Sequence, residues 1–228
     1  MSAVDPGREG TPEGAEAPVK IKGHKWFAAI FDAMSRSEER GFLGEMRRKL
    51  LGDLSGDVLE IGAGTGANFE HYPAGVRVTA LEPDPYMLRR AETKLAALGR
   101  KDITLRQGPA EQLASPDASF DAVVSTLVLC TVHDVPRSLA EIRRVLRLGG
   151  ELRFIEHVRG TGFVGGTQDL IKPVWGWFGA GCHPNRRTED ALRAAGFDVV
   201  IAERRKMMGF VPLVRGACVR PSAPDKAR

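Results

Sequence analysis

One stretch, from Val58 to Phe69, constrains the fold of this chain more than any other. Its apolar run breaks into three alternating glycines, and a second apolar run, Val76 to Leu81, is closed by Glu82. This order predicts a strand, a glycine-rich turn, a helix start and a second strand with a carboxylate at its tip. Such a unit brings backbone close to an adenosine-containing ligand and places a carboxylate on its ribose hydroxyls. We therefore expect the chain to bind an adenosine cofactor.

Two such cofactors compete for this turn: a nicotinamide dinucleotide and S-adenosylmethionine. The glycines alone do not decide, because Gly62, Gly64 and Ala67 also satisfy the dinucleotide pattern. Glu60 favours S-adenosylmethionine, since a carboxylate before the turn suits an ammonium group and would repel a pyrophosphate. The helix expected after the turn, 68–72, is short because Pro73 ends it. A dinucleotide site instead has a long helix whose N-terminus binds the pyrophosphate.

Length and composition limit which class of protein this chain can be. The 228 residues suit one domain with a real core, and no apolar run approaches the ~20 residues that span a bilayer. The three cysteines are odd in number and widely spaced, which predicts neither a zinc site nor a disulfide framework. With no signal peptide visible, we expect a cytoplasmic protein that holds no metal.

The net charge of +4 is unevenly distributed, because the first 19 residues are mostly acidic where they are charged. The rest of the chain is therefore more basic than the total. A basic surface suits an anionic substrate or a membrane surface, or is simply solvated. We expect no nucleic-acid partner, since no basic platform with interleaved aromatic residues stands out.

The chain divides into four expected parts. We expect a disordered leader over 1–19, N-terminal helices over 20–55 that cover the active site, a main domain over 56–220 and a flexible tail over 221–228. Within the main domain strands alternate with helices, which predicts an α/β fold with an open parallel sheet and right-handed crossovers. No helix fits between the last two strands, so they should pair as an antiparallel hairpin. The expected strands are 58–61, 76–82, 103–107, 122–127, 151–157, 197–204 and 214–219, and the expected helices are 85–98, 136–146 and 188–195.

This order resembles the class I S-adenosylmethionine-dependent methyltransferases over roughly residues 26–219. The matching segments are Val58–Gly66, Leu81–Pro83, Pro109–Leu113, Phe120–Val124 and Arg144–Gly150. The resemblance implies a Rossmann-like, seven-stranded and mostly parallel sheet with an antiparallel last strand and helices on both faces.

One subfamily is more similar still, the methyltransferase-like 7 proteins, which are alkyl thiol S-methyltransferases. The segments that carry this likeness are Ala67–Phe69, Tyr72–Pro73, Ser125–Cys130, Glu156–Val158, Trp175, Gly181–Cys182 and Arg187–Thr188. Those proteins have an N-terminal hydrophobic anchor, whereas the leader here is polar. Attachment to endomembranes is therefore not expected.

The turn and the resemblance together assign a cofactor site. Gly62, Gly64 and Gly66 let backbone pass against the cofactor because no Cβ intrudes. Glu60 should anchor the methionine ammonium, and Glu82 should accept hydrogen bonds from both ribose hydroxyls. The remaining expected cofactor residues are Ala63, Thr65, Asn68, Pro83, Met87, Ala110, Glu111, Thr126 and Leu127.

Pro109 stands where the broad superfamily often has an Asp that accepts the adenine amine. Glu111, a backbone carbonyl or water must then take that bond. The thiol subfamily shows a proline here too, so this departure agrees with the closer resemblance.

The substrate side is expected between 163 and 182, a segment that is both glycine-rich and aromatic. Three interpretations stay open for it: a lid with glycine hinges, core packing against the sheet, or a membrane-surface patch. His157 is the candidate catalytic residue, to assist a substrate proton or orient a nucleophile, with a structural histidine as the alternative. Cys130 is expected as a small apolar filler. The expected substrate-binding residues are Trp26, Trp175, Trp177 and Cys182.

The leading hypothesis is a methyltransferase that acts on a small molecule, most simply on the thiol of an apolar compound. A thiol with a pKa of ~8.5 needs little help from a base, and no strong base is evident. The alternatives are N- or O-methylation of a lipid headgroup, quinone or natural product, a non-catalytic S-adenosylmethionine-binding protein, and an NAD(P)-dependent oxidoreductase. We expect a monomer or homodimer, with peripheral membrane contact as one option.

Overall fold

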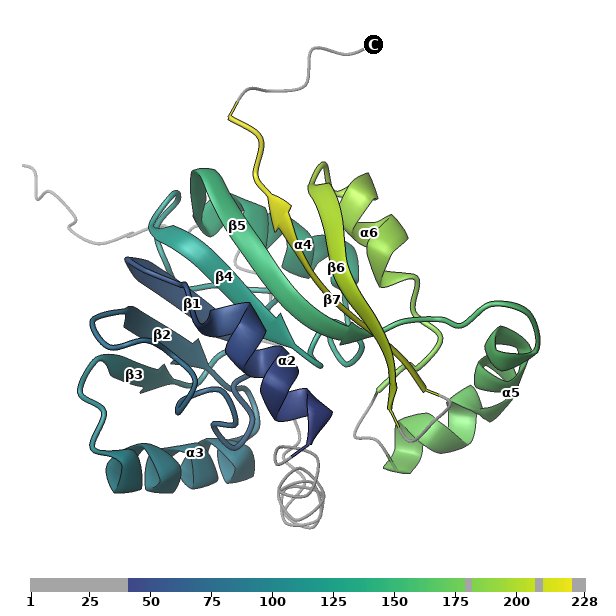
Figure 1. Ribbon diagram of the computed structural model, residues 1–228, viewed down its shortest axis with the longest axis horizontal. Coiled ribbons are helices and arrows are strands. Elements are labelled where there is room, and N and C mark those ends of the chain that lie inside the picture. Colours follow the sequence, from purple (N-terminus) through teal and green to yellow (C-terminus); the bar gives the residue numbers. More distant parts are fainter. Residues whose placement is uncertain (1–40, 179–181, 208–210, 223–228) are drawn as a thin grey trace, which may run out of the picture.

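The computed structural model describes residues 41–178, 182–207 and 211–222. The expected leader, the first part of the expected N-terminal helices (20–40, with Trp26) and most of the tail fall outside this part, and so do the side chains of 172–178. The described residues form a seven-stranded sheet with the order β3-β2-β1-β4-β5-β7-β6 (Figure 1). Its strands are β1 Asp57–Ile61, β2 Arg77–Leu81, β3 Ile103–Arg106, β4 Phe120–Thr126, β5 Leu146–His157, β6 Asp198–Met207 and β7 Val211–Val219.

The pairing confirms the predicted fold class. Strands β1 to β5 pair in parallel, whereas β7 is antiparallel to both β5 and β6. The parallel strands therefore all end at one edge of the sheet, and open α/β sheets bind their ligands at that edge. The predicted hairpin of β6 and β7 is also present.

Strand β5 begins earlier than predicted, at Leu146 rather than Glu151. The sequence Gly149-Gly150, which favours a sharp turn before the strand, lies inside the strand instead. Gly149 keeps the left-handed conformation of such a turn, with a φ of 77°, and the register with β4 shifts at this point. Pairing of Phe120 with Leu146 extends the strand across the irregularity.

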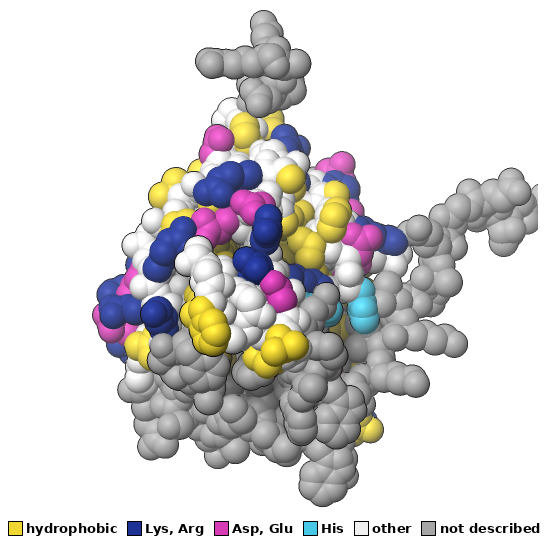
Figure 2. All heavy atoms as spheres, turned by 90° about the vertical axis from the view of Figure 1, so that its right-hand side faces the viewer, with side chains coloured by type: hydrophobic (Ala, Val, Ile, Leu, Met, Phe, Trp, Pro, Cys, Tyr) yellow, Lys and Arg dark blue, Asp and Glu magenta, His cyan; other side chains and the backbone are white. Residues whose placement is uncertain are grey.

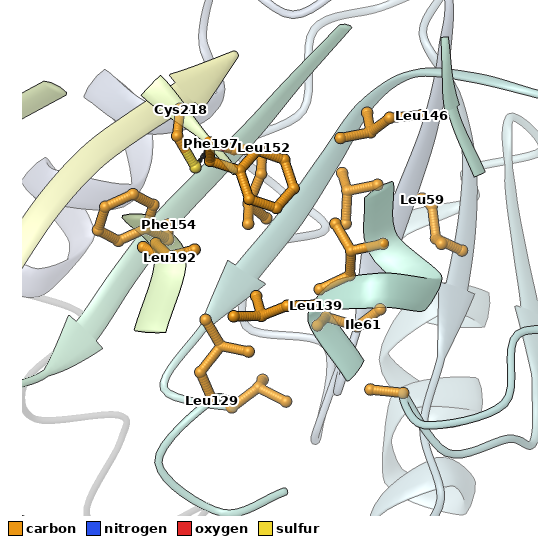
Figure 3. Close-up of a cluster of buried hydrophobic side chains, with 14 of the residues drawn as sticks. Leu59, Ile61, Leu129, Leu139, Leu146, Leu152, Phe154, Leu192, Phe197 and Cys218 are labelled. Atoms are coloured by element: carbon orange, nitrogen blue, oxygen red, sulfur yellow. Dashed lines mark hydrogen bonds between the residues drawn. The ribbon is translucent and has the colours of Figure 1, made fainter. Parts of the chain in front are cut away.

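Helices cover both faces of the sheet. Helix α2 (Phe42–Leu51) packs on one face with α3 (Pro85–Leu98), which contributes Ala91 to the core there. Helices α4 (Val135–Val145) and α6 (Thr188–Ala194) pack on the other face, where Leu139 and Leu192 meet side chains of β1 and β5 (Figure 3). Neighbouring residues of a strand point to opposite faces, so Val58 belongs to the α2 core and Leu59 to the α4 core.

Local sequence explains where α3 begins and ends. The side chain of Asp84 accepts hydrogen bonds from the backbone amides of Tyr86 and Met87, and Pro85 is at the first helical position. Gly99 ends the helix with a φ of 63°, in the left-handed conformation that glycine adopts at low cost. The same cap chemistry recurs in α4, where Asp134 accepts from the amide of Arg137.

The prediction of a short helix over 68–72 is wrong, because this segment is a run of turns. The amides of Phe69 and His71 bond to carbonyls only three residues back, at Gly66 and Asn68. Pro73 follows too soon for a full helical turn to form.

Helix α5 (Gly162–Phe178) lies beyond the end of β5, beside the sheet rather than across either face (Figure 1). Of the three interpretations of this segment, core packing does not hold for its first half, because Phe163 and Leu170 are 87% and 80% exposed. None of the described helices is both long and apolar enough to cross a membrane.

Candidate functional site

The glycine turn after β1 is bonded directly to the acid after β2. The amide of Gly64 donates to Oε2 of Glu82 at 2.7 Å, and the amide of Asp84 donates to Oε1 at 2.8 Å. Each oxygen accepts one backbone donor, and a carboxylate has about four acceptor positions in all. Burial raises the pKa of Glu82 to about 7, against the lowering effect of these two amides. The side chain is thus held in place with acceptor capacity left for the hydroxyls of a ribose.

The glycines of the turn have two different roles: two allow close packing, and one borders open space. Gly62, Gly64 and Gly66 all have positive φ, of 59°, 58° and 83°. A Cβ at Gly62 would lie 2.5 Å from a methyl of Val128, and one at Gly66 would collide with Phe69. A Cβ at Gly64 would meet nothing within 4 Å. The backbone of Gly64 therefore borders open space next to Glu82, which fits the adenosine end of S-adenosylmethionine.

Glu60 lies in a buried polar network below the turn. It is 1% exposed, and its two oxygens accept from Nδ2 of Asn68 at 2.8 Å and from the hydroxyl of Tyr72 at 2.9 Å. Asn68 also donates to Oγ1 of Thr126 at 3.0 Å, and Arg47 donates to both Asn68 and Thr126. Burial raises the pKa of Glu60, and Asn68, Tyr72 and the Arg47 charge oppose that rise. The expected contact of Glu60 with the cofactor ammonium stays a prediction.

Arg47 and Tyr72 are the residues of this network that the sequence analysis missed. Arg47 comes from α2 and is only 4% exposed. A signal was present, since an arginine at position 47 lies between Met46 and Leu50 on an otherwise apolar helix face. Because α2 carries this guanidinium into the site, the helix supports the turn as well as covering the sheet.

Ala110 and Glu111 are buried, as a place beside adenine requires. One oxygen of the Glu111 carboxylate is already used, however: Oε1 accepts from the amide of His133 at 2.8 Å and from that of Asp134 at 3.5 Å. Its backbone carbonyl accepts from Nε of Arg137 at 2.9 Å. Glu111 thus fixes the loop before α4, and its expected hydrogen bond to adenine stays a prediction.

The chain leaves β4 in a tight turn that Glu156 holds in shape. Leu127 has a positive φ of 61°, which is unusual for a residue with a side chain. Oε1 of Glu156 accepts from Ser125 Oγ at 2.7 Å and from the amides of Val128 and Leu129 at 3.0 Å. Burial raises the pKa of Glu156. This glutamate therefore shapes the turn whose Val128 packs against Gly62.

His157, at the end of β5, lies between two cysteines. Its Nδ1 is 4.0 Å from Sγ of Cys130 and 3.9 Å from Sγ of Cys182, and all three residues are buried. A hydrogen bond with Cys182, together with burial, raises the pKa of Cys130 well above its ordinary value. No spacing pattern predicts this cluster, because Cys130 and Cys182 are 27 and 25 residues from His157.

The other expected substrate residues are only partly placed. Cys182 joins His157, whereas Trp26 and the side chains of Trp175 and Trp177 lie outside the described residues. The described half of α5 is tied to its surroundings by polar contacts. Gln168 bonds to the backbone of Val158, Gly160 and Pro184, and Asp169 pairs with Arg159.

The remaining cofactor residues surround the turn. Ala63 and Thr65 are buried in it, Pro83 follows Glu82, and Met87 is buried at the start of α3. A hollow of about 440 Å³ is lined by α4 and α6 and by the loops before them, which contribute Leu129, His133 and Arg186. It adjoins the cofactor residues without including them.

Comparison with known proteins agrees with this geometry. Residues 59–154 match the family described as "Methyltransferase domain". Thiol S-methyltransferase TMT1B of Homo sapiens is 39% identical over 175 residues, which are 72% of this chain and 70% of that protein. Phosphatidylethanolamine N-methyltransferase of Cereibacter sphaeroides is 35% identical over 139 residues, which are 55% and 68% of the two chains. Among solved structures, the YcgJ protein of Bacillus matches with a TM-score of 0.69 at 16% identity, over 79% of this chain and 98% of that one, and so supports the fold.

Proposed function

Because this chain belongs to the class I S-adenosylmethionine-dependent methyltransferases and is a relative of the TMT1 thiol S-methyltransferases, we propose that its methyl acceptor is the thiol of a small apolar compound. The chain is an enzyme that uses S-adenosylmethionine to methylate a small molecule. The proposal concerns which atom of the acceptor receives the methyl group.

The described residues fit the cofactor at two points. Glu82 offers acceptors for ribose hydroxyls, and the open space at Gly64 admits the ligand against backbone. When bound, S-adenosylmethionine supplies a methyl group on a sulfonium, which leaves as a neutral thioether and needs no acid. The protein then has to align the acceptor with that methyl group and exclude water.

One observation supports the choice of a thiol: three buried carboxylates around the site are bonded to the protein's own groups, and only Oε2 of Glu156 among their oxygens is buried without a partner in the described part of the chain. Glu60 is bonded to Asn68 and Tyr72, Glu111 to the loop before α4, and Glu156 to the turn after β4. An alcohol needs a strong, free base to become a nucleophile. A thiol ionises near pH 8.5, so a thiolate forms without such a base.

The test is to compare acceptors that differ in a single atom. The full chain is incubated with S-adenosylmethionine and hexanethiol, hexanol or hexylamine, and release of S-adenosylhomocysteine is measured. We expect turnover with the thiol alone. Turnover with the alcohol or amine, and none with the thiol, would contradict the proposal.

Methylation of a lipid headgroup is a second candidate, and exposed apolar side chains on α5 favour it. Phe163 and Leu170 project into solvent from this helix, and Ile171 is 38% exposed. The face that carries α5 and α6 shows such hydrophobic groups among lysines and arginines (Figure 2). Apolar groups with basic neighbours suit an anionic membrane surface. Vesicles with and without phosphatidylethanolamine, added to the same assay, distinguish this candidate by the appearance of a methylated headgroup.

A further inference from the structure

Three potential metal ligands converge beside the cofactor residues. Cys130 lies in the turn after β4, His157 ends β5, and Cys182 follows α5. Their ligand atoms, two thiol sulfurs and an imidazole nitrogen, all lie within 4.8 Å of one another. Cys130 is also two residues from Val128, whose methyl groups pack against Gly62 of the glycine turn. Sγ of Cys130 also donates to the carbonyl of Leu127, an expected cofactor residue, at 3.5 Å, so the cluster adjoins the expected cofactor site.

Hydrogen bonds between the segments hold the cluster together. The amide of His183 donates to the carbonyl of Cys130 at 2.8 Å, which fixes Cys182 beside that loop. Arg186 donates to the carbonyls of Leu129 at 2.6 Å and Val132 at 2.5 Å. Rigid backbone around a ligand set is what a preorganised metal site needs.

The hydrogen bonds of the two thiols in this cluster are weak ones, since sulfur is a weak donor and a weak acceptor. Both sulfurs approach the same ring nitrogen of His157, and that nitrogen has one lone pair or one proton to offer. The other ring nitrogen, Nε2, is buried and has no hydrogen-bond partner among the described residues. Nδ1 can bond only one of the two thiols at a time, and Sγ of Cys130 also donates to the carbonyl of Leu127 at 3.5 Å.

A zinc-type ion suits both the distances and the charge. Zinc binds sulfur at about 2.3 Å and nitrogen at about 2.0–2.1 Å, so a tetrahedral site separates sulfur from nitrogen by roughly 3.5 Å. The observed 3.9 and 4.0 Å need to shorten by only about half an ångström. Two thiolates and a neutral imidazole cancel the charge of a divalent ion, as a buried site requires.

We propose that Cys130, His157 and Cys182 bind one divalent ion of the zinc type, and that the sulfur of the methyl acceptor occupies its fourth position. This inference rests on the proposed thiol acceptor. Three protein ligands with one position left open are the usual arrangement of a catalytic zinc site, whereas structural sites are closed by four.

The chemistry balances without a further reactant. On binding the ion, the acceptor thiol releases its proton to solvent, because a coordinated thiol is deprotonated. The acceptor sulfur then forms the bond to the methyl carbon, while the bond from that carbon to the sulfonium breaks and leaves its electron pair on the cofactor sulfur. The product thioether is a neutral, weak ligand and dissociates. The ion does not change its oxidation state.

Metal content and spectroscopy of the full chain test the site without relying on activity. The protein is loaded with Zn²⁺ or Co²⁺, gel-filtered and analysed for metal. We expect one ion per chain, and for Co²⁺ an intense sulfur-to-metal band that shifts with hexanethiol and not with hexanol. Cys130→Ser and Cys182→Ser should each weaken binding by about 100-fold or more, since each removes a thiolate ligand. Cys218→Ser is the matched control, because this buried cysteine donates to the carbonyl of Leu152 instead.

The outcomes separate this inference from the proposed function. The metal site is contradicted if the wild-type chain retains no metal after gel filtration. It is also contradicted if mass spectrometry finds a disulfide between Cys130 and Cys182 in place of a metal. Both results hold even where hexanethiol is methylated. If the absorption band of the Co²⁺-loaded protein does not shift with hexanethiol, the acceptor sulfur is not the fourth ligand of the ion. Bound metal without turnover of any thiol supports the site and overturns the proposed acceptor. The wild-type measurement decides even where a cysteine variant fails to fold.

Discussion

The backbone amide of Gly64 donates a 2.7 Å hydrogen bond to Oε2 of Glu82, which joins the glycine turn after β1 to the acid after β2. The two halves of the cofactor site are thus one hydrogen-bonded unit. A change at either residue is expected to affect cofactor binding through the other.

Glu82→Gln should weaken S-adenosylmethionine binding by about 10- to 100-fold, because hydrogen bonds to a charged group contribute about 1.5–3 kcal/mol. The amide keeps one acceptor oxygen and can accept from only one of the two backbone amides, so circular dichroism is used to check that the variant is folded. Calorimetric titration measures the affinity, and Glu92→Gln, at an exposed position of α3, is the control. Unchanged binding in Glu82→Gln would mean that the cofactor site is misplaced.

The pH dependence of binding should report the same carboxyl. The pKa of Glu82 is raised to about 7 by burial, with Asp84 and Glu60 adding to the rise. Ribose hydroxyls that donate to the carboxylate favour its ionised form, so binding should release a proton and become tighter as the pH rises from 6 to 8, roughly one unit either side of that pKa. Calorimetry in buffers of different ionisation enthalpy counts the released proton, which Glu82→Gln should abolish.

Folding stability should respond to this group with the opposite sign. Between the ordinary pKa of 4.5 and about 7 the folded chain keeps a proton that the unfolded chain has lost. Unfolding then releases a proton, so the contribution of Glu82 to the free energy of unfolding falls as the pH rises through this window. Urea unfolding at several pH values should show a smaller fall in Glu82→Gln than in the wild type. An equal fall in both would contradict the assignment.

Gly64→Ala and Gly99→Ala form a matched pair. Both glycines have φ near 60° and neither would bring its Cβ within 4 Å of another atom. Both variants should therefore lose about 1–2 kcal/mol of stability through backbone strain, as thermal unfolding measures. Only Gly64→Ala should also lose cofactor affinity, because its methyl group enters the space beside Glu82. Equal affinities would show that this space is not used by the cofactor.

Tyr72→Phe should destabilise the chain by about 1–3 kcal/mol, because it removes the hydroxyl that donates to the buried Glu60. Urea unfolding checks this value. Tyr86→Phe makes the same chemical change at a position that is 37% exposed and should have little effect. Similar losses in the two variants would mean that the hydrogen bond to Glu60 contributes nothing particular.

The sequence by itself determined the sheet and the cofactor turn, because these depend on local patterns. Apolar runs bounded by glycine and acid set β1 and β2, and Asp84, Pro85 and Gly99 set the ends of α3 through cap chemistry that acts within a few residues. Because no helical pattern fits between the expected strands 197–204 and 214–219, the sequence also predicted their antiparallel pairing.

Only the tertiary structure decided which side chains meet. Arg47 reaches Asn68 and Thr126 across 21 and 79 residues, and His157 meets Cys130 and Cys182 across three separate segments. Such contacts follow from the stacking of α2 on the sheet and from the shared edge where β4 and β5 end, and no spacing in the chain encodes them. The burial that raises the pKa of Glu82 likewise comes from the packed fold, since an isolated strand end would leave that carboxylate in water.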